Sequence, residues 1–248
     1  MSKKILVAIS KTPDTTTKIK FSADGKAFDE AGVKYIVNPY DEWYALVRAI
    51  EIKETSGGSV TVISVGSSDY DPIIRKALAI GADDAVRIDT EPEDAFQVSS
   101  EIATYARDKG FDLVMFGKET IDFNGSQVGG MVAAILDIPY VSNASKMDLD
   151  GNSATIVRDI QGGKEHLAVS TPFAVSASKG MAEQRIPNMR GIMEAKRKKL
   201  EVIPAAGSEK LTEVVSYELP PEKGEVKMID ADNPEQLIDL LHNEAKII

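Results

Sequence analysis

Short runs of consecutive aliphatic residues constrain this chain more than any other feature of its sequence. The clearest run is Ile5-Leu6-Val7-Ala8-Ile9, and similar runs follow over Val60 to Val65, Ala85 to Ile88 and Leu113 to Phe116. A strand with one face in water alternates apolar and polar residues, so unbroken runs are typical of strands buried on both faces in a parallel sheet. We expect Ile5 to Ile9 to be the central strand.

Segments with apolar residues at helical spacing lie between these runs. Asn38 can cap the first of them and Pro39 suits its first position, because proline lacks the N–H that a first helical turn leaves unpaired. The expected helices extend from this cap to Gly57 or Gly58, and then over Pro72 to Ile80, Asp94 to Lys109 and Ser126 to Leu136. This alternation predicts an α/β fold with a doubly wound, mostly parallel, Rossmann-like sheet.

Beyond Pro139 the residues alternate between polar and apolar. The alternating segments Ser145 to Leu149, Thr155 to Ile160 and Leu167 to Ser170 predict an antiparallel extension of the sheet. Lys18 to Phe28 alternates in the same way around the turn dipeptide Asp24-Gly25, which predicts a short hairpin. Residues 178–190 predict a loop, and Ile192 to Leu200 predicts a short basic helix.

The last part of the chain has a different character. Residues 205–248 are acidic and interrupted by glycine and proline, and only Pro234 to Ala245 has helical spacing. Such a segment buries no core of its own, so it lies on the body, docks on another chain or is partly disordered. We therefore expect an α/β domain with its extension over residues 1–204 and an acidic C-terminal arm over residues 205–248.

Composition excludes several kinds of chemistry. The chain has no cysteine and two histidines, which excludes disulfides, thiol catalysis and Cys-ligated metals and leaves little for histidine metal sites. The aliphatic runs are far shorter than the roughly 20 residues that a bilayer requires, so we expect no membrane insertion. A net charge of -10 argues against nucleic acid as a partner. The first residues lack the pattern of a signal peptide, and we expect a cytoplasmic protein.

The loop after the fourth aliphatic run carries the strongest sign of a ligand site. In doubly wound sheets, ligands bind at the carboxyl ends of the strands, here Ile9 to Thr15, Gly66 to Asp69 and Gly117 to Gly130. The last of these contains closely spaced glycines and leads into a helix, whose free N–H groups favour a phosphate. No G-x-G-x-x-G follows a strand and no P-loop motif is present, which disfavours standard dehydrogenases and P-loop NTPases.

Each of these features also has a plainer structural role. Gly129 and Gly130 could serve helix packing alone, and Asn38 to Asp41, whose polar groups could meet an adenine or ribose, could only cap a helix. The basic residues between Arg185 and Lys199 could attract an acidic partner or a phosphate, or could form a solvated helix face. Met181 precedes them in a polar loop, where an exposed methionine could anchor a partner.

Several motifs, taken in order, resemble the beta subunits of electron transfer flavoproteins. They are Asn38-Pro39-Tyr40-Asp41-Glu42, Ala77-Leu78-Ala79-Ile80-Gly81-Ala82-Asp83, Gly117-Lys118 with Ile121-Asp122, Gln127-Val128-Gly129, Arg158 with Gly162-Gly163, and Ile192-Met193-Glu194-Ala195-Lys196-Arg197-Lys198. The resemblance extends from about residue 3 to residue 204. It implies an α/β nucleotide-binding fold of the adenine nucleotide alpha hydrolase-like type.

The resemblance also implies a function and site residues. The chain would pair with an alpha subunit that holds most of a shared FAD, accept electrons from dehydrogenases such as acyl-CoA dehydrogenases and pass them toward a quinone reductase. It would bind an AMP through Ala8, Asn38, Pro39, Tyr40, Asp41, Val65, Asn124, Gly125, Ser126, Gln127, Val128, Gly129, Gly130 and Met131. A partner-recognition loop would cover Ser178 to Met189, with Met181 as anchor and with Lys179, Gly180 and Arg185 beside it.

Departures from the family pattern leave two alternatives open. Val128 replaces a threonine, which removes a hydroxyl contact to phosphate, and Thr15 replaces a tyrosine. Thr12 to Thr15 is similar to members that bifurcate electrons and bind a second FAD in place of AMP, with oxidation of NADH. The other alternative is a stand-alone, homodimeric, adenine-nucleotide-binding stress protein, against which the long antiparallel extension and the arm argue.

Overall fold

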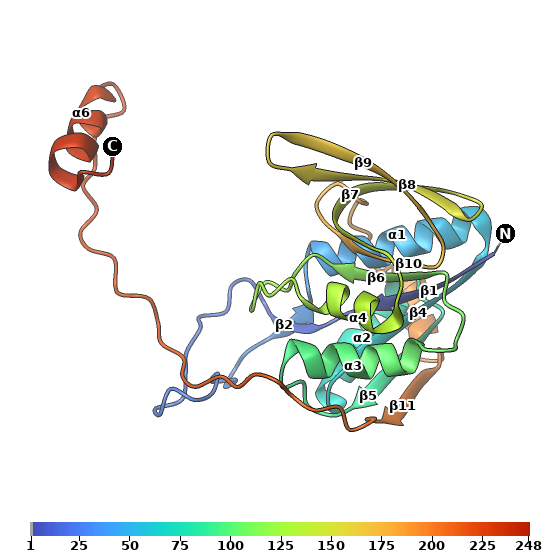
Figure 1. Cartoon of the computed structure of the whole chain (residues 1–248). Helices are drawn as coiled ribbons and strands as arrows, with labels where there is room; N and C mark the ends of the chain where they lie inside the picture. The colour runs from blue at the N-terminus through green and yellow to red at the C-terminus, as the bar shows by residue number, and fades with distance from the viewer. Residues whose placement is uncertain (1) are drawn as a thin grey trace. The chain divides into compact units, whose positions relative to one another are not determined.

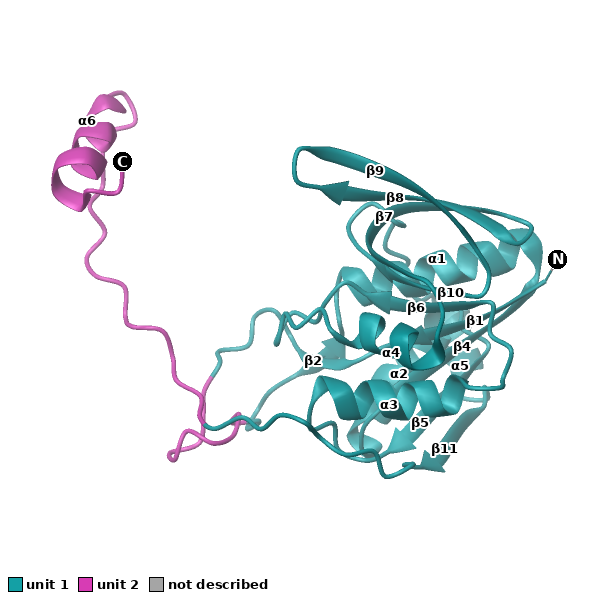
Figure 2. Cartoon of the chain, viewed as in Figure 1, with its two compact units in different colours: residues 1–19, 30–215 teal, residues 20–29, 216–248 magenta. Residues whose placement is uncertain are grey.

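The computed structural model describes residues 2–248, and these residues form two compact units (Figure 2). The larger unit comprises the residues through Ile19 together with Glu30–Val215, and the smaller comprises Lys20–Asp29 and Ser216–Ile248. The larger unit contains the sheet and its covering helices. Residues 205–215 therefore belong to the larger unit. For this part of the acidic segment, the structure agrees with the first of the three expectations, that the segment lies on the body of the protein.

A single large sheet organises the larger unit (Figure 1). Within residues 2–248 it has nine strands in the order β11-β5-β4-β1-β6-β10-β7-β8-β9. Their bounds are β1 Lys3–Ala8, β4 Gly58–Val65, β5 Asp84–Asp89, β6 Leu113–Gly117, β7 Tyr140–Asp150, β8 Ser153–Ile160, β9 Gly163–Ser170, β10 Phe173–Ala177 and β11 Leu200–Pro204. Strands β11 to β7 pair in parallel, and β7, β8 and β9 pair antiparallel. The predicted doubly wound, mostly parallel sheet with an antiparallel extension is confirmed.

Helices cover both faces of the parallel part and bury two separate cores (Figure 1). Helices α1 (Asp41–Ser56) and α2 (Asp71–Ile80, after a 3-10 turn over Ser68–Tyr70) pack on one face, and α3 (Ala95–Ala106) and α4 (Val128–Leu136) pack on the other. Successive side chains of β1 enter opposite cores, Ile5 and Val7 on the α1 side and Leu6 and Ala8 on the α3 side. This two-sided burial is why β1 is aliphatic throughout, as a central strand requires.

Chain order reverses at β1, which positions the site. After β1 the chain builds β4 and β5 on one side, and it then returns to place β6 on the other side of β1. Crossovers that leave on opposite faces open a crevice at the carboxyl ends of these strands. The loops that follow β1 and β6 therefore meet at one edge of the sheet.

The predicted basic helix over Ile192 to Leu200 is confirmed only for Ile192 to Ala195, because the helix begins earlier and ends earlier than expected. Helix α5 covers Met189–Ala195, and its start is capped by Asn188, whose Oδ1 accepts a hydrogen bond from Gly191 N at 2.8 Å. The chain then becomes an edge strand, because Ala85 N donates to Lys199 O at 3.0 Å and β11 continues alongside β5. Strand β10 and the small antiparallel pair β2 (Lys11–Pro13) and β3 (Tyr35–Val37) are also absent from the sequence-based expectation.

The smaller unit combines the expected turn with the end of the chain. Phe21 and Phe28 form an isolated antiparallel bridge, which confirms pairing across Asp24-Gly25, and the Phe21 ring stacks on Tyr217 with centroids 5.0 Å apart. The end of the chain is helical over α6 (Glu235–Asp239) and a π-helical turn (Leu240–Ala245), as its spacing predicted. Among residues 2–248, no helix combines the length and the apolar character needed to cross a bilayer.

Candidate functional site

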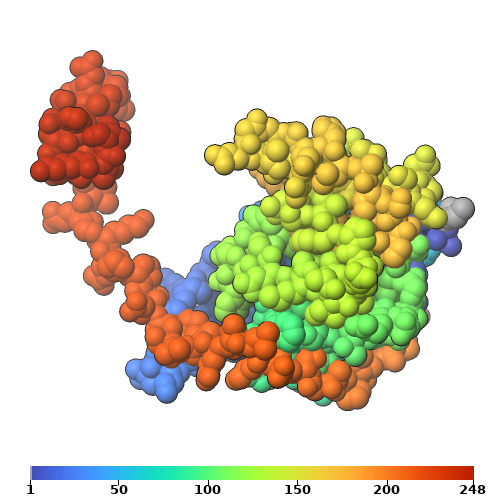
Figure 3. Space-filling model, in the orientation of Figure 1, coloured from blue at the N-terminus to red at the C-terminus, as the bar shows by residue number. Residues whose placement is uncertain are grey.

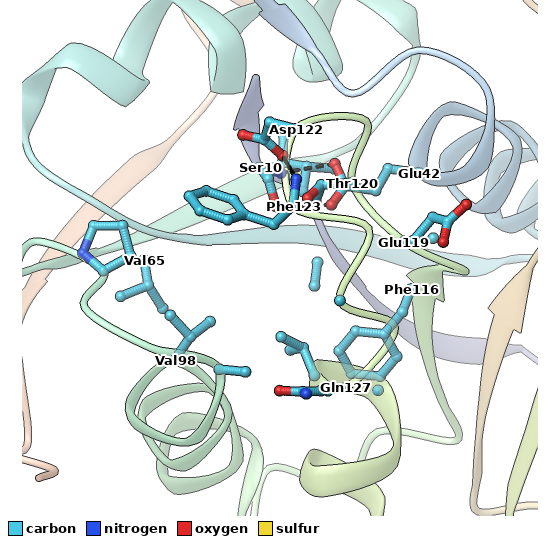
Figure 4. A pocket seen from close by; sticks show the side chains of 18 of the residues that line it. Ser10, Glu42, Val65, Val98, Phe116, Glu119, Thr120, Asp122, Phe123 and Gln127 are labelled. Carbon is cyan, nitrogen blue, oxygen red and sulfur yellow. Dashed lines mark hydrogen bonds between the residues drawn. The ribbon is translucent and has the colours of Figure 1, made fainter. Parts of the chain in front are cut away.

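A cavity of about 430 Å³ opens at the reversal point of the sheet (Figure 4). Ala8 and Val65, at the ends of β1 and β4, and Gly117, at the end of β6, all line it. The loop after β1 contributes Ile9 to Lys11, and the loop after β6 contributes residues from Lys118 onward. The sequence-based expectation of a shared crevice is confirmed for the loops after β1 and β6, whereas Gly66 to Asp69, the expected contribution after β4, does not line the cavity.

One side of the cavity is apolar. Val65 and Val98 lie on one wall and Phe116 lies near Gln127 on another, while the ring of Phe123 projects across the opening (Figure 4). Phe123 is 71% exposed although its ring borders the cavity. Such walls suit a flat apolar group, for which a few polar atoms at the rim fix the orientation.

The start of α4 gives the cavity its anion-binding character. Helix α4 begins at Val128, so the first amide groups of this nine-residue helix have no intrahelical acceptor, and Gln127, Val128 and Gly129 line the cavity. These N–H groups and the helix dipole favour a negative charge. The approach to the helix is fixed by left-handed backbone at Asn124 (φ 49) and Ser126 (φ 52) and by Ser126 Oγ, which donates to Lys118 O at 2.9 Å.

The two adjacent glycines of α4 have different roles. A Cβ on Gly129 would lie 2.9 Å from the Tyr140 hydroxyl oxygen and 3.2 Å from Phe116 Cδ2, whereas a Cβ on Gly130 would make an ordinary contact of 3.5 Å with Tyr140. Gly129 is thus required for packing of the helix on the sheet. This supports the plainer role for Gly129, and its place at the cavity makes close approach of a ligand possible as well.

Asn38 does not cap the first helix. Helix α1 begins at Asp41, after Tyr40, whose φ is positive (68°), and it has no side-chain cap. The fully buried Asn38 instead ties down the loop after β6, because its Nδ2 donates to Glu119 O at 2.8 Å and its Oδ1 accepts from Ile121 N at 3.1 Å. Loop closure by a buried amide competes successfully with capping, and Pro39 is consequently not the first helical residue.

Glu42 is a cavity residue that the sequence-based interpretation did not assign. It lies in the first turn of α1, and its carboxylate accepts hydrogen bonds from Ser10 N and Ser10 Oγ, each at 2.8 Å (Figure 4). Burial raises the pKa of the Glu42 carboxyl to about 8, although the Ser10 bonds act in the opposite direction. The sequence feature that could have indicated this role is the position of Glu42, an acidic residue directly before the apolar and aromatic residues with which the helix begins.

Charged side chains at the rim are mostly paired. Lys118 forms an ion pair with Glu119 at 2.8 Å, and this contact raises the pKa of the lysine. Lys11 places its ammonium 4.1 Å from the ring centroid of Tyr35 and 4.0 Å from Glu30. Both lysines line the cavity and could turn toward an anionic ligand.

The structure brings together about half of the residues expected at the AMP. Those lining the cavity are Ala8, Val65, Gly125, Ser126, Gln127, Val128 and Gly129. Those outside its lining are Asn38, Pro39, Tyr40, Asp41, Asn124, Gly130 and Met131. Thr212 and Val214, from the segment after β11, also line the cavity. The sequence-based expectation placed this segment in the C-terminal arm.

The expectation that Met181 is exposed is wrong. Its side chain is 5% exposed and packs in the core on the α1 face, while Lys179 and Gly180 beside it are exposed. The chain turns sharply here, with Gly180 at φ 103 and Met181 N donating to Ser178 O at 3.2 Å, and this turn points the methionine inward. Exposed apolar side chains occur farther along, at Ile186 and Met189.

Several basic residues between Arg185 and Lys199 have structural partners. Arg185 pairs with Glu54 through two contacts of 2.7 and 3.0 Å, and Arg190 pairs with Glu194 at 2.7 Å. Lys198 Nζ donates to Leu78 O at 2.9 Å, at the end of α2. A structural role therefore accounts for part of this basic stretch, and Lys196 and Arg197 are exposed.

Comparison with known proteins agrees with this geometry. The family model of the electron transfer flavoprotein domain matches residues 26–208. Electron transfer flavoprotein subunit beta of Bacillus subtilis is 35% identical over 258 residues, covering 98% of this chain and 99% of that protein. The proteins of the same name from Syntrophomonas wolfei (34% identical; 100% and 99% covered) and Homo sapiens (35%; 89% and 90%) are similar. The chain therefore belongs to the electron transfer flavoprotein family, alongside its beta subunits.

Proposed function

We propose that this chain is the beta subunit of a heterodimeric electron transfer flavoprotein and that its cavity binds an AMP with a structural role. The observation that carries the proposal is a preformed cavity at the reversal point of the sheet, closed on one side by the start of α4. The membership of the chain in the family supports the electron-carrier role. In this proposal the chain carries no substrate chemistry of its own.

The residues present fit an adenylate. The free amide groups at Val128 and Gly129 would hold the phosphate, and the apolar walls around Val65 and Phe116 would contact the adenine. The family's threonine hydroxyl is absent at Val128, so backbone amides would hold the phosphate. Pro39 to Asp41 immediately precede Glu42, which lines the cavity, but they do not line it themselves. They would contact the nucleotide only if the loop before α1 shifted slightly.

The FAD would lie mainly in the alpha subunit and supplies the redox chemistry when bound. This chain would contribute scaffold, the nucleotide site and a docking surface for dehydrogenases such as acyl-CoA dehydrogenases, with onward transfer to a quinone oxidoreductase. The acidic arm, residues 205–248, would dock on the alpha subunit, at least from Ser216 onward, where the smaller unit resumes. We further propose a cytoplasmic location without membrane insertion and without nucleic acid as a partner.

Identifying the nucleotides in the purified pair tests this proposal. We expect one FAD and one AMP per heterodimer when the coexpressed alpha and beta subunits are denatured and the released nucleotides are quantified by mass spectrometry. Two FAD and no AMP would instead establish the alternative of a bifurcating protein, for which Thr12 to Thr15 argues. A stable homodimer without flavin would establish the stress-protein alternative, and a pair without any nucleotide would contradict both flavoprotein proposals.

A charge at the exposed apolar residue of the recognition loop should slow electron acceptance. Ile186 is 79% exposed, between Arg185 and the start of α5, and so replaces Met181 as the proposed anchor. We expect Ile186→Glu to reduce kcat/KM with the partner dehydrogenase about tenfold or more, because a buried apolar contact would acquire an unpaired charge. Bound flavin should be unchanged in its absorbance spectrum.

Ile160→Glu is the matched control, since Ile160 is an exposed isoleucine at the end of β8, away from this loop in the sequence. It should leave the reduction kinetics at the wild-type value. Equal kinetics for Ile186→Glu and the wild type would remove Ile186 from the docking surface.

A further inference from the structure

The segment that follows β11 lies across the cavity-bearing side of the larger unit. Residues 205–215, here called the clasp, continue from β11 along α3 (Figure 1), and orange atoms of this part of the chain lie directly against that helix in the space-filling view (Figure 3). Thr212 and Val214 of the clasp contribute to the lining of the cavity. The clasp is therefore part of the wall and not a free extension.

A buried carboxylate on α3 holds the first half of the clasp. Glu101 is 2% exposed, and its Oε2 accepts a hydrogen bond from Ala206 N at 2.7 Å while its Oε1 accepts one from Ser208 N at 2.9 Å. These bonds hold the pKa of the Glu101 carboxyl below its ordinary value despite its burial. Charge-assisted bonds to backbone N–H groups are stronger than neutral ones.

A second carboxylate, at the start of α3, holds the other half. Asp94 Oδ1 caps α3 by accepting from Gln97 N at 2.7 Å. Its Oδ2 accepts from Leu211 N at 2.6 Å, from Thr212 N at 2.7 Å and from Thr212 Oγ1 at 3.2 Å. Asp94 itself lines the cavity, so this attachment lies at the edge of the site.

Side-chain burial contributes little to holding the clasp. Leu211 is 62% exposed and Val214 is 50% exposed, and every residue of 205–215 is exposed or only partly buried. Lys210 adds only an exposed ion pair with Glu93 at 2.6 Å. The two carboxylates are therefore the principal attachments, and a segment attached in this way can detach without disturbing the core.

We propose that the clasp closes the nucleotide cavity and limits the rate at which bound nucleotide leaves, with Asp94 as the positioning residue that fastens it at the rim. This inference rests on the proposed function, because it assumes that an adenine nucleotide occupies the cavity. The clasp ends at Val215 and is followed in the chain by Ser216, the first residue of the arm that belongs to the smaller unit.

A reversible disulfide in place of the rim attachment tests the clasp. The chain has no cysteine, so Asp94→Cys with Thr212→Cys creates a thiol pair that is unique in this subunit. The purified pair of subunits is incubated with isotopically labelled AMP, and exchange of bound nucleotide is followed by mass spectrometry. We expect exchange roughly tenfold faster than in the wild type when the thiols are reduced, and a return to the wild-type rate or slower after oxidation.

A second variant covers the case in which the double substitution prevents assembly. Glu101→Gln keeps the shape of the side chain but removes its charge, and should accelerate exchange roughly tenfold. Glu165→Gln on β9, which removes the carboxylate that pairs with Arg158 of β8, is the matched control and should exchange at the wild-type rate. Thr212→Cys alone should not respond to oxidant.

Two failures can be told apart. Nucleotide present in the wild type with equal exchange in the reduced, oxidised and Glu101→Gln proteins would overturn the clasp and leave the proposed nucleotide site intact. A wild-type pair that releases no adenine nucleotide would overturn the proposed site, and the clasp with it.

Discussion

Replacing Gly117 by alanine is expected to lower the thermal midpoint of the assembled protein by roughly 2–12 °C, equivalent to about 1–3 kcal/mol of overpacking. Gly117 ends β6 at the cavity, where the backbone of α1 passes close by. A Cβ at this position would lie 2.7 Å from the backbone nitrogen of Glu42 and 2.7 Å from Glu42 Cγ. A backbone atom cannot avoid the added Cβ by a change of rotamer, as the end of a side chain could. Strand β6 or the start of α1 would therefore have to shift.

The same substitution is expected to reduce nucleotide content. A displaced α1 would move Glu42, and a displaced β6 would move the loop that leads into α4, so both sides of the cavity would lose their alignment. The measurements are the thermal midpoint by differential scanning calorimetry and the nucleotide released per heterodimer. Gly163→Ala on β9 is the control, because its added Cβ would have nothing within 4 Å. Equal midpoints for the two variants would contradict the close approach at Gly117.

The parallel part of the fold could be predicted because burial on both faces leaves a strong mark on the sequence. Every residue of the Ile5 to Ala8 run enters one of the two cores, so none of them is polar. The same argument placed the cavity, since the edge at which parallel strands end follows from their direction. The start of α4 could be located because closely spaced glycines between a buried strand and a helix are typical of a phosphate-binding turn.

The features that were not predicted from the sequence depend on contacts between residues far apart in the chain, which compete with the local preferences of each residue. Asn38 suits a helix cap locally, but the loop at Glu119 and Ile121, more than 80 residues away, takes both ends of its amide. Leu200 to Pro204 forms a strand because the edge of β5 is available, and no local pattern records that edge. Met181 is a hydrophobic residue in a polar loop, and its sequence neighbours do not indicate whether its side chain is buried or exposed. The turn at Gly180 directs the side chain into the core.

Glu42 should make this protein lose stability as the pH rises through neutrality. The folded-state pKa of about 8 lies above the ordinary value of 4.5, so the folded protein holds a proton between these values that the unfolded chain has released. Stability falls with pH wherever the folded state binds more protons. This contribution is fully present below about pH 4.5 and lost above about pH 8, with a total change of at most about 5 kcal/mol.

Glu42→Gln isolates this effect because it keeps the side chain neutral at every pH. The glutamine Oε1 can still accept from Ser10 N, and its amide can donate to Ser10 Oγ, so the local bonds survive. We expect wild type and variant to have similar thermal midpoints near about pH 4.5, and we expect the variant to become progressively more stable than the wild type up to about pH 8 and to remain clearly more stable near about pH 9. The measured quantity is the difference between the two proteins, because other titrating groups act on both.

Glu51→Gln is the matched control, since Glu51 lies on the same helix but pairs with Arg48 at 2.9 Å near the surface. It should leave the pH dependence of the midpoint parallel to that of the wild type. If the thermal midpoint of Glu42→Gln also changes with pH in parallel with that of the wild type, Glu42 is ionised throughout this range. The hydrogen bonds from Ser10 would then outweigh the effect of burial on the Glu42 carboxylate. The cavity would then contain a permanent negative charge opposite the start of α4, and a phosphate would be confined to the α4 side by repulsion from Glu42 as well as by attraction to the helix.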